Sequence, residues 1–150
     1  MRSKISRSRR STAYLAAAML VAGSLLTGCM MLAKPPQDLD YSRSRTSEAG
    51  RYRATIKPDG DSIPKGKLQR WTLHLETTAG APVDSAAIAV DGGMPQHGHG
   101  LPTKPRVTRR LGHGDHLVEG MKFNMGGWWV VKFRVSSAAG NDSLTFNLQL

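Results

Sequence analysis

The residues of this 150-residue sequence that are best suited to chemistry are histidines and methionines in its second half. His97 and His99 are separated by a single glycine, so in an extended chain both imidazoles project to the same side. Met94 precedes this pair, and Met121 and Met125 follow it. Imidazole nitrogen binds copper, zinc and nickel, whereas thioether sulfur selects copper, above all Cu(I). The pattern therefore predicts a copper site with His97 and His99 as primary ligands and methionine sulfur beside them.

Ordinary structural roles compete with this prediction. Histidines in a glycine-rich loop commonly bond to backbone carbonyls, and a lone H-x-H motif is a weak signal. Met121 and Met125 share one side of an extended segment with Phe123, which favours core packing for at least one of the two methionines. Met94 stands directly before a proline, and we expect it to be exposed. Among the methionines it is therefore the one least easily explained by packing.

Two further histidines are weaker ligand candidates. His113 and His116 flank Gly114 and Asp115, a combination that is typical of a hairpin turn. We rank both below the H-x-H pair. His74 alternates with apolar neighbours and is expected on the surface.

Catalytic motifs are missing from the sequence. It contains no G-x-S-x-G nucleophile elbow, no H-E-x-x-H zinc motif and no phosphate-binding P-loop. Serine, histidine and aspartate all occur, but nothing in their spacing orders them into a triad. We therefore do not expect an enzyme.

The start of the chain has the three parts of an export signal. Its first ten residues are basic and contain no acidic residue, and an apolar run from Ala13 to Leu26 follows, too short to span a bilayer comfortably. Leu26-Thr27-Gly28-Cys29 resembles the lipobox of bacterial lipoproteins, whose cysteine receives diacylglycerol before cleavage. We expect residues 1–28 to be removed as a signal peptide and lipid on Cys29 to hold the mature chain to a membrane. An uncleaved anchor helix or an ordinary secretory signal is the alternative.

Lipidation of Cys29 would place the mature chain in the cell envelope, facing the periplasm. Met30 stands where an aspartate retains lipoproteins in the inner membrane of some bacteria, so the outer membrane is favoured. Because Cys29 is the only cysteine, we expect no disulfide, no thiolate metal site and no cysteine nucleophile. The 21 Lys and Arg exceed the 11 Asp and Glu, but they are scattered, so nucleic acid is not an expected partner.

The rest of the chain is predicted to form a tether followed by one β domain. Residues 29–50 are polar and include two consecutive prolines, as flexible linkers do. In residues 51–150 apolar and polar residues alternate with period two, which predicts half-buried strands. The expected strands cover 52–56, 71–75, 86–90, 106–111, 115–121, 129–135 and 144–150. About seven strands separated by turn residues favour an immunoglobulin-like antiparallel β-sandwich, with a small barrel as the alternative.

Two segments of this domain resemble the YtkA-like and FixH-like envelope domains. They are Met94 to Gly100, with the motif H-x-H-G, and Leu117 to Met125 followed by Gly127-Trp128, with the motif F-x-M-x-G-x-W. The likeness covers residues 51–150 and implies a β-sandwich associated with copper handling or respiratory oxidase assembly. By this resemblance, His97 and His99 match the histidine motif of the family, and Met121 and Met125 match its methionine positions. His113 and His116 match no fixed motif of the family.

Two functions are open at this point. The leading hypothesis is a lipid-anchored carrier or chaperone that passes copper to an envelope protein or an oxidase assembly factor. The alternative is a metal-free protein-interaction module of an envelope or respiratory complex. In that case the glycine-rich histidine loop and an exposed Trp128 would form the docking surface.

Overall fold

Alternating apolar residues build antiparallel strands throughout the part of the chain that the computed structural model describes, residues 35–150. The strands are β1 (Ser44–Thr46), β2 (Tyr52–Pro58), β3 (Gln69–Thr77), β4 (Ala86–Met94), β5 (His99–Gly100), β6 (Arg106–Gly112), β7 (Asp115–Met121), β8 (Trp128–Ser137) and β9 (Gly140–Gln149). A 3-10 turn, Pro95–His97, joins β4 to β5. The predicted all-β antiparallel fold is confirmed. The seven longer strands are the expected ones, and β1 and β5 are short additions.

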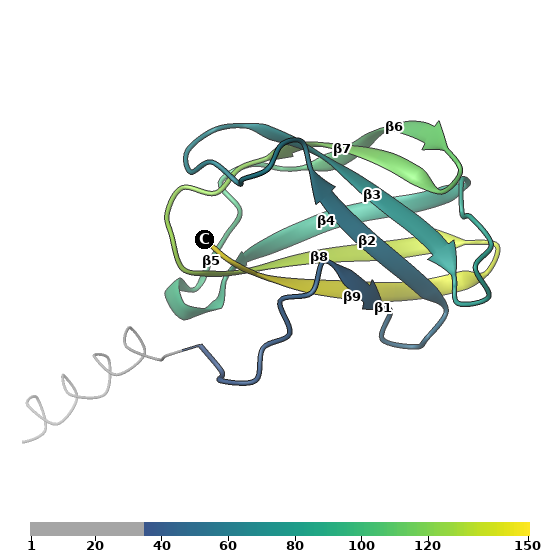
Figure 1. The fold of residues 1–150 in the computed structure, drawn as a ribbon, viewed down its shortest axis with the longest axis horizontal. Helices are drawn as coiled ribbons and strands as arrows, with labels where there is room; N and C mark the ends of the chain where they lie inside the picture. The colour runs from purple at the N-terminus through teal and green to yellow at the C-terminus, as the bar shows by residue number, and fades with distance from the viewer. Residues whose placement is uncertain (1–34) are drawn as a thin grey trace, which may run out of the picture. The chain divides into compact units, whose positions relative to one another are not determined.

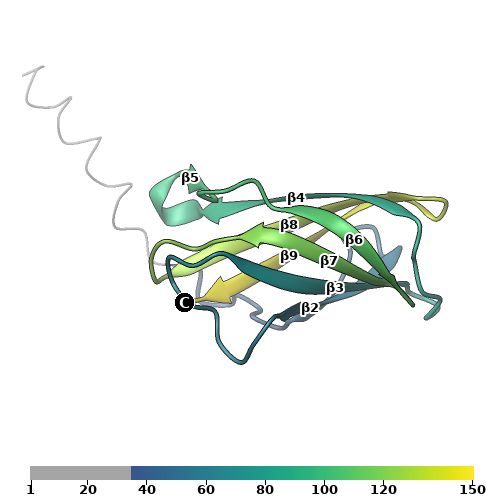
Figure 2. The same cartoon turned by 90° about the horizontal axis from the view of Figure 1, so that it is seen from above.

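The strands form one hydrogen-bonded path that folds into two layers. Its order is β1-β2-β3-β7-β6-β4-β8-β9, and β5 pairs with β4 outside this path. Figure 2 shows β2, β3 and β7 in one layer and β4, β8 and β9 in the other. β6 links the layers, because it pairs with β7 along its length but with β4 only where Ala89 faces Arg106. The sandwich is therefore open along most of this seam.

The opposite seam is closed by hydrogen bonds from the segment after β1 to β9. The Glu48 amide donates to the Ser143 carbonyl oxygen at 2.9 Å, and the Ala49 amide donates to the Asp142 carboxylate at 3.0 and 3.2 Å. Partial burial acts to raise the pKa of Asp142, but hydrogen bonds from the Ser47 side chain and nearby backbone amides outweigh it and lower the pKa to about 2. The two layers are thus joined on both sides, which gives the sandwich some character of a barrel.

Residues 29–50 are predicted to form a tether, but the folded domain already begins within this segment. β1 pairs with β2, and Arg45 lies opposite Ala54. The Asn147 side-chain amide also donates to the Asp40 carbonyl oxygen at 3.1 Å. The segment is polar because it contributes backbone pairing at a sheet edge rather than apolar surface, so its composition resembles that of a linker. The predicted signal peptide and Cys29 lie outside the described residues. Within the described part, no helix is long and apolar enough to cross a membrane.

The core lies between the layers and has a large aromatic component. It contains Tyr52, Ala54, Ile56, Trp71, Leu73, Leu75, Val118, Met121, Phe123, Trp129, Val131, Phe133, Val135, Leu144, Phe146 and Leu148 among others. Trp71 packs against Phe123 at a ring-centre distance of 5.7 Å, and Phe123 meets Trp129 edge to face at 5.2 Å. Each large apolar side chain buried in this way contributes about 1.5–3 kcal/mol of transfer free energy. This aromatic group lies at the end of the sandwich that carries β5.

Candidate metal site

The histidine loop folds back on the strand that precedes it. β4 ends at Met94, the 3-10 turn carries His97, and β5 then pairs His99 with Met94. Gly98 makes this reversal possible, since its φ of +65° lies in the left-handed region and its amide donates to the Met94 carbonyl oxygen at 3.0 Å. The prediction of an extended H-x-H segment is therefore wrong locally. A turn brings the two imidazoles together.

The two imidazole rings are close enough to share one metal ion. The ring centres of His97 and His99 are 5.7 Å apart with an angle of 24° between their planes, and both side chains are exposed. A metal–nitrogen bond of about 2.0–2.1 Å places an ion roughly 3.2 Å from each ring centre, so two rings on one ion lie at most about 6.4 Å apart. The His99 Nδ1 atom lies 3.5 Å from the Gly100 carbonyl oxygen, and no described residue bonds to its Nε2 atom. The spacing of the two rings is therefore compatible with one shared ion.

The aromatic core positions one of these imidazoles. His99 meets the Trp129 ring edge to face at 6.2 Å. The indole Nε1–H of Trp129 donates to the Met125 carbonyl oxygen at 3.1 Å, which ties the loop before β8 to the same ring. Trp129 has no exposed surface, so it forms a rigid floor for His99. We use the name "His–Met end" for Met94, His97, His99, Met125 and Trp129 together.

The three candidate methionines differ sharply in exposure. Met125 is 41% exposed, whereas Met94 is 1% exposed and Met121 is fully buried. The expectation that Met94 is exposed is therefore wrong: it closes the core, and its methyl group packs so near Gly127 that a Cβ there would lie 2.9 Å away. Met121 packs inside the core cluster. Of the three, Met125 alone presents its side chain to solvent, on the loop whose carbonyl oxygen is bonded to Trp129.

A groove of about 530 Å³ runs from the His–Met end over the outer face of the β4–β8–β9 layer. Its lining includes Met94, His99, Trp128 and Lys132. Trp128 is half-buried, and its Nε1–H donates to the Asn147 Oδ1 atom at 3.0 Å. The groove connects His99 to an outer surface of the sheet to which another molecule can bind.

His113 and His116 lie at the other end of the sandwich. His113 occupies the β6–β7 turn, is exposed and has a φ of +53°. His116 is fully buried, and its Nε2–H donates to the Val83 carbonyl oxygen at 2.8 Å. His74, on the outer face, bonds through Nδ1 to Asp115 at 2.7 Å. The structure therefore does not bring these histidines together with His97 and His99.

The donors at the His–Met end suit a soft metal ion better than a hard one. Within residues 35–150, no group of three or more His, Cys, Asp or Glu side chains is placed to hold a metal. Ca²⁺ and Mg²⁺ require several oxygen ligands, and structural zinc sites use four nitrogen or sulfur ligands. Two imidazoles with a nearby thioether match the preferences of copper.

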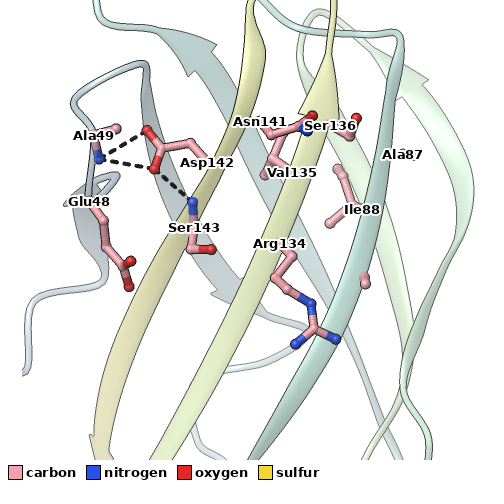
Figure 3. Close-up of a pocket in the computed structure, with 11 residues that line it drawn as sticks. Glu48, Ala49, Ala87, Ile88, Arg134, Val135, Ser136, Asn141, Asp142 and Ser143 are labelled. Atoms are coloured by element: carbon pink, nitrogen blue, oxygen red, sulfur yellow. Dashed lines mark hydrogen bonds between the residues drawn. The ribbon is translucent and has the colours of Figure 1, made fainter.

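A larger groove, of about 840 Å³, lies away from this chemistry. Figure 3 shows it on β4, β8 and β9, with Asp142 bonded to the Ala49 and Ser143 amides at one side. Ile88 and Val135 supply apolar lining and Arg134 the cationic group. Because Asp142 is occupied by these amides, it serves the closure of the sandwich rather than a ligand.

Comparison with known proteins agrees with this architecture. A family model described as YtkA-like matches residues 46–134, which is more than half of the chain. This chain belongs to the YtkA-like family. None of the curated proteins and none of the solved structures matches it significantly. The likeness to FixH-like domains stays a prediction.

The matched range has two structural consequences. It contains every candidate ligand of this YtkA-like domain, from Met94 to Met125, and it begins at Thr46, inside β1. It ends at Arg134, although β9 supplies core residues such as Phe146. Gly127 and Trp129 are the glycine and the tryptophan of the F-x-M-x-G-x-W motif, but the motif did not indicate that they support the site. In the structure Gly127 leaves room for the Met94 methyl group, and Trp129 packs against His99.

Proposed function

We propose that this YtkA-like domain is a copper carrier of the cell envelope, with His97 and His99 as its primary ligands. The observation that carries the proposal is the pair of exposed imidazoles with ring centres 5.7 Å apart, one of which, His99, packs against a buried tryptophan. Met125 adds sulfur from the neighbouring loop, and Met94 stands beneath the pair as a second thioether. Copper is cargo here, not a resident cofactor.

An exposed, incomplete ligand set suits a carrier. Both histidines are open to solvent, so ligands of a partner can approach the ion from outside and replace the carrier's ligands one at a time. The rigid floor under His99 limits the motion needed to hold the ion, which keeps the cost in conformational entropy low. The partner in this proposal is a copper-accepting envelope protein or an oxidase assembly factor. No catalytic role is proposed.

The site lies on a domain that lipid on Cys29 would hold to a membrane, facing the periplasm. The basic first ten residues, the apolar run and the lipobox-like tetrapeptide support this anchoring. Replacing Cys29 with serine is expected to abolish incorporation of labelled palmitate and to leave residues 1–28 attached, so that the protein runs as a larger precursor on a denaturing gel. Palmitate incorporation into Cys29→Ser, at the size of the parent protein, would contradict lipid attachment there.

Copper titration tests the binding site directly. The protein is expected to bind about one equivalent of Cu(II), and of Cu(I) under reducing conditions, by competition with a chromophoric chelator. His97→Ala/His99→Ala removes both imidazoles and should weaken binding at least a hundred-fold. The matched control His74→Ala/His113→Ala removes two exposed histidines elsewhere and should bind like the parent.

Methionine variants distinguish the ligands that bind Cu(I) from those that bind Cu(II). Met125→Ala should weaken Cu(I) binding by about ten-fold and leave Cu(II) binding nearly unchanged, because thioether sulfur prefers the softer ion. Retention of parental copper affinity by the double histidine variant would refute the assignment of ligands.

A metal-free interaction module is a second candidate, favoured by the groove beside His99. Its lining combines the half-buried Trp128 with Val130 and backbone of the glycine-rich segment, a mixture common at protein interfaces. Under this alternative, Trp128→Ala should reduce recovery of an envelope partner equally from chelated and copper-loaded samples. A copper-dependent interaction would instead favour the carrier.

A further inference from the structure

β6 is the most exposed and most basic long strand of the described domain. Lys104, just before it, and Arg106, Arg109 and Arg110 within it are all exposed. Apart from the single pairing of Arg106 with Ala89, no strand covers the side of β6 that faces away from β7. Two register shifts interrupt its pairing with β7. Bulges and charges of this kind discourage another strand from adding to an edge.

The positive charge of this strand is not neutralised. Among residues 35–150, neither Lys104 nor any of the three arginines forms an ion pair. Within the β6–β7 hairpin, Asp115 is already bonded to His74, which leaves Glu119, opposite Arg106, to offset the four positive charges. Six of the 21 basic residues precede residue 35, which leaves 15 against 11 acidic residues and a net charge of +4 for the described part. The β6 group, with a net charge of +3, accounts for most of it.

An apolar side chain stands at the end of this basic strand. Leu111 is 46% exposed next to Arg110, and the exposed His113 forms the turn that follows. Lys104, Arg106 and Thr108 also border a small hollow of about 160 Å³, whose lining includes Glu119 and Gly120. Basic residues around a projecting leucine suit the interface of an anionic bilayer, where the cations meet phosphates and the leucine enters the headgroup region.

We propose that the β6–β7 hairpin docks the domain on an anionic phospholipid surface. β6 runs antiparallel to β4, so it leads away from Met94, and its turn lies at the end of the sandwich opposite β5 (Figure 1). Docking through the hairpin therefore turns the His–Met end away from the lipid. In this orientation a partner can reach the histidine pair without meeting the bilayer.

In this orientation the linker must run the length of the sandwich. Asp40 is held by Asn147, which lies across β8 from Gly93 and therefore close to the His–Met end. About 11 residues separate Asp40 from Cys29, and such a segment spans at most about 40 Å when fully extended. The ten residues of β8 span roughly 33 Å, so a nearly extended linker reaches a bilayer at the far end. The inference rests on the proposed anchoring through Cys29 to bring the domain to a bilayer, but it does not rest on copper binding.

Vesicle binding of the folded unit without its lipid tests the inference. Residues 35–150 form one compact unit that contains the whole core described above. This unit is expected to co-sediment with vesicles of equal parts phosphatidylglycerol and phosphatidylcholine, but not with phosphatidylcholine alone. Binding should weaken as salt rises, because counterions screen the attraction. Arg106→Ser/Arg109→Ser/Arg110→Ser should lower the partition coefficient about a hundred-fold.

The matched control removes three exposed cations elsewhere, in Lys67→Ser/Lys132→Ser/Arg134→Ser, and should lower it less than about five-fold. Leu111→Ser should lower it several-fold, with little change in its salt dependence. Equal losses in the two triple variants would overturn the hairpin assignment, since net charge alone would then explain binding. If the parent ignores the anionic vesicles but binds polyglutamate through the same arginines, the partner is an acidic protein and the bilayer is the wrong surface.

Copper titration of the same variants keeps this inference separate from the proposed function. The triple arginine variant should bind copper like the parent. His97→Ala/His99→Ala should bind anionic vesicles like the parent. Loss of both activities in either variant, with its thermal unfolding unchanged, would contradict the separation of the two ends.

Discussion

The two ends of this sandwich each carry a pair of histidines, and the pairs have opposite physical characters. At one end His97 and His99 are both exposed, their rings lie 5.7 Å apart, and a buried tryptophan supports one of them. At the other end His116 is sealed in the core while His113 stands alone on a turn. Similar spacing in the sequence thus leads to a possible ligand pair in one case and to two unrelated roles in the other.

This difference shows that the route of the backbone decides whether two histidines can act together. A turn at Gly98 places His97 beside His99. Across the β6–β7 turn, the start of β7 carries His116 inward, where it bonds to the Val83 carbonyl, and leaves His113 in solvent. The following predictions test this contrast, beginning with the largest expected effect.

Removing the buried histidine should destabilise the fold without affecting metal binding. His116→Ala leaves a cavity and an unpaired Val83 carbonyl, so the free energy of unfolding should fall by about 2–4 kcal/mol in a urea titration. His97→Ala/His99→Ala, which removes exposed rings, should change it by less than about 0.5 kcal/mol per site. The contrast fails if the exposed pair proves as costly to remove as His116.

The packing of Met94 on Gly127 should make the His–Met end sensitive to one methyl group. Gly127 has a φ of +119°, so Gly127→Ala meets both backbone strain and the Met94 methyl at 2.9 Å. Gly60→Ala is a matched control, because Gly60 has a φ of +113° with open space around it. The control should cost roughly 1–2 kcal/mol from strain, and Gly127→Ala about 1 kcal/mol more from overpacking. Equal losses would mean that Met94 adjusts freely.

Acid should weaken the closure of the sandwich through Asp142. Its pKa is lowered to about 2 in the folded state from the ordinary 3.8, so the carboxylate stabilises the fold above about pH 4, and this stabilisation disappears as the pH falls through 2. Asp142→Asn should cost about 1 kcal/mol at pH 7, because solvent screens this partly exposed group.

Urea titrations at several pH values measure this effect. The difference between Asp142→Asn and the parent should shrink between pH 4 and pH 2. Asp61→Asn, at an exposed residue without a hydrogen-bond partner in the described part, should show no such trend. A difference that does not depend on pH would show that the charge of Asp142 is irrelevant to the closure.

The smallest effect is expected at the exposed histidine of the β6–β7 turn. His113→Gly relieves the left-handed conformation at φ +53° but increases the entropy of the unfolded chain, so the two contributions nearly cancel. The free energy of unfolding should change by less than about 0.5 kcal/mol, measured by urea titration. Copper affinity should not change. A loss of copper binding would place His113 in the site and break the contrast between the two ends.

Sequence patterns predicted the strands well and the site only in part. Period-two alternation located five of the seven long strands, because the burial of one sheet face imposes that period locally. The expected strands at 106–111 and 115–121 showed the pattern more weakly, and β6 is in fact exposed along most of its length. The alternation did not find β1, whose three residues contribute backbone pairing rather than apolar surface. The position of Met94 before a proline led us to expect an exposed side chain, but the structure buries it, because the small Gly127 in a distant loop leaves room for its methyl group.

The sequence by itself determined which kinds of donor the chain offers, the all-β class and the membership of the YtkA-like family, since all three depend on residue types and local periodicity. Only the tertiary structure decided which donors meet. The pairing of β5 with β4 and the packing of Trp129 under His99 create one end. Because β6 pairs with β4 at one position only, Lys104 and the three arginines of β6 remain exposed on the hairpin that leads to the other end. These contacts join residues that are distant in the chain or lie across turns, so a local sequence pattern does not predict them.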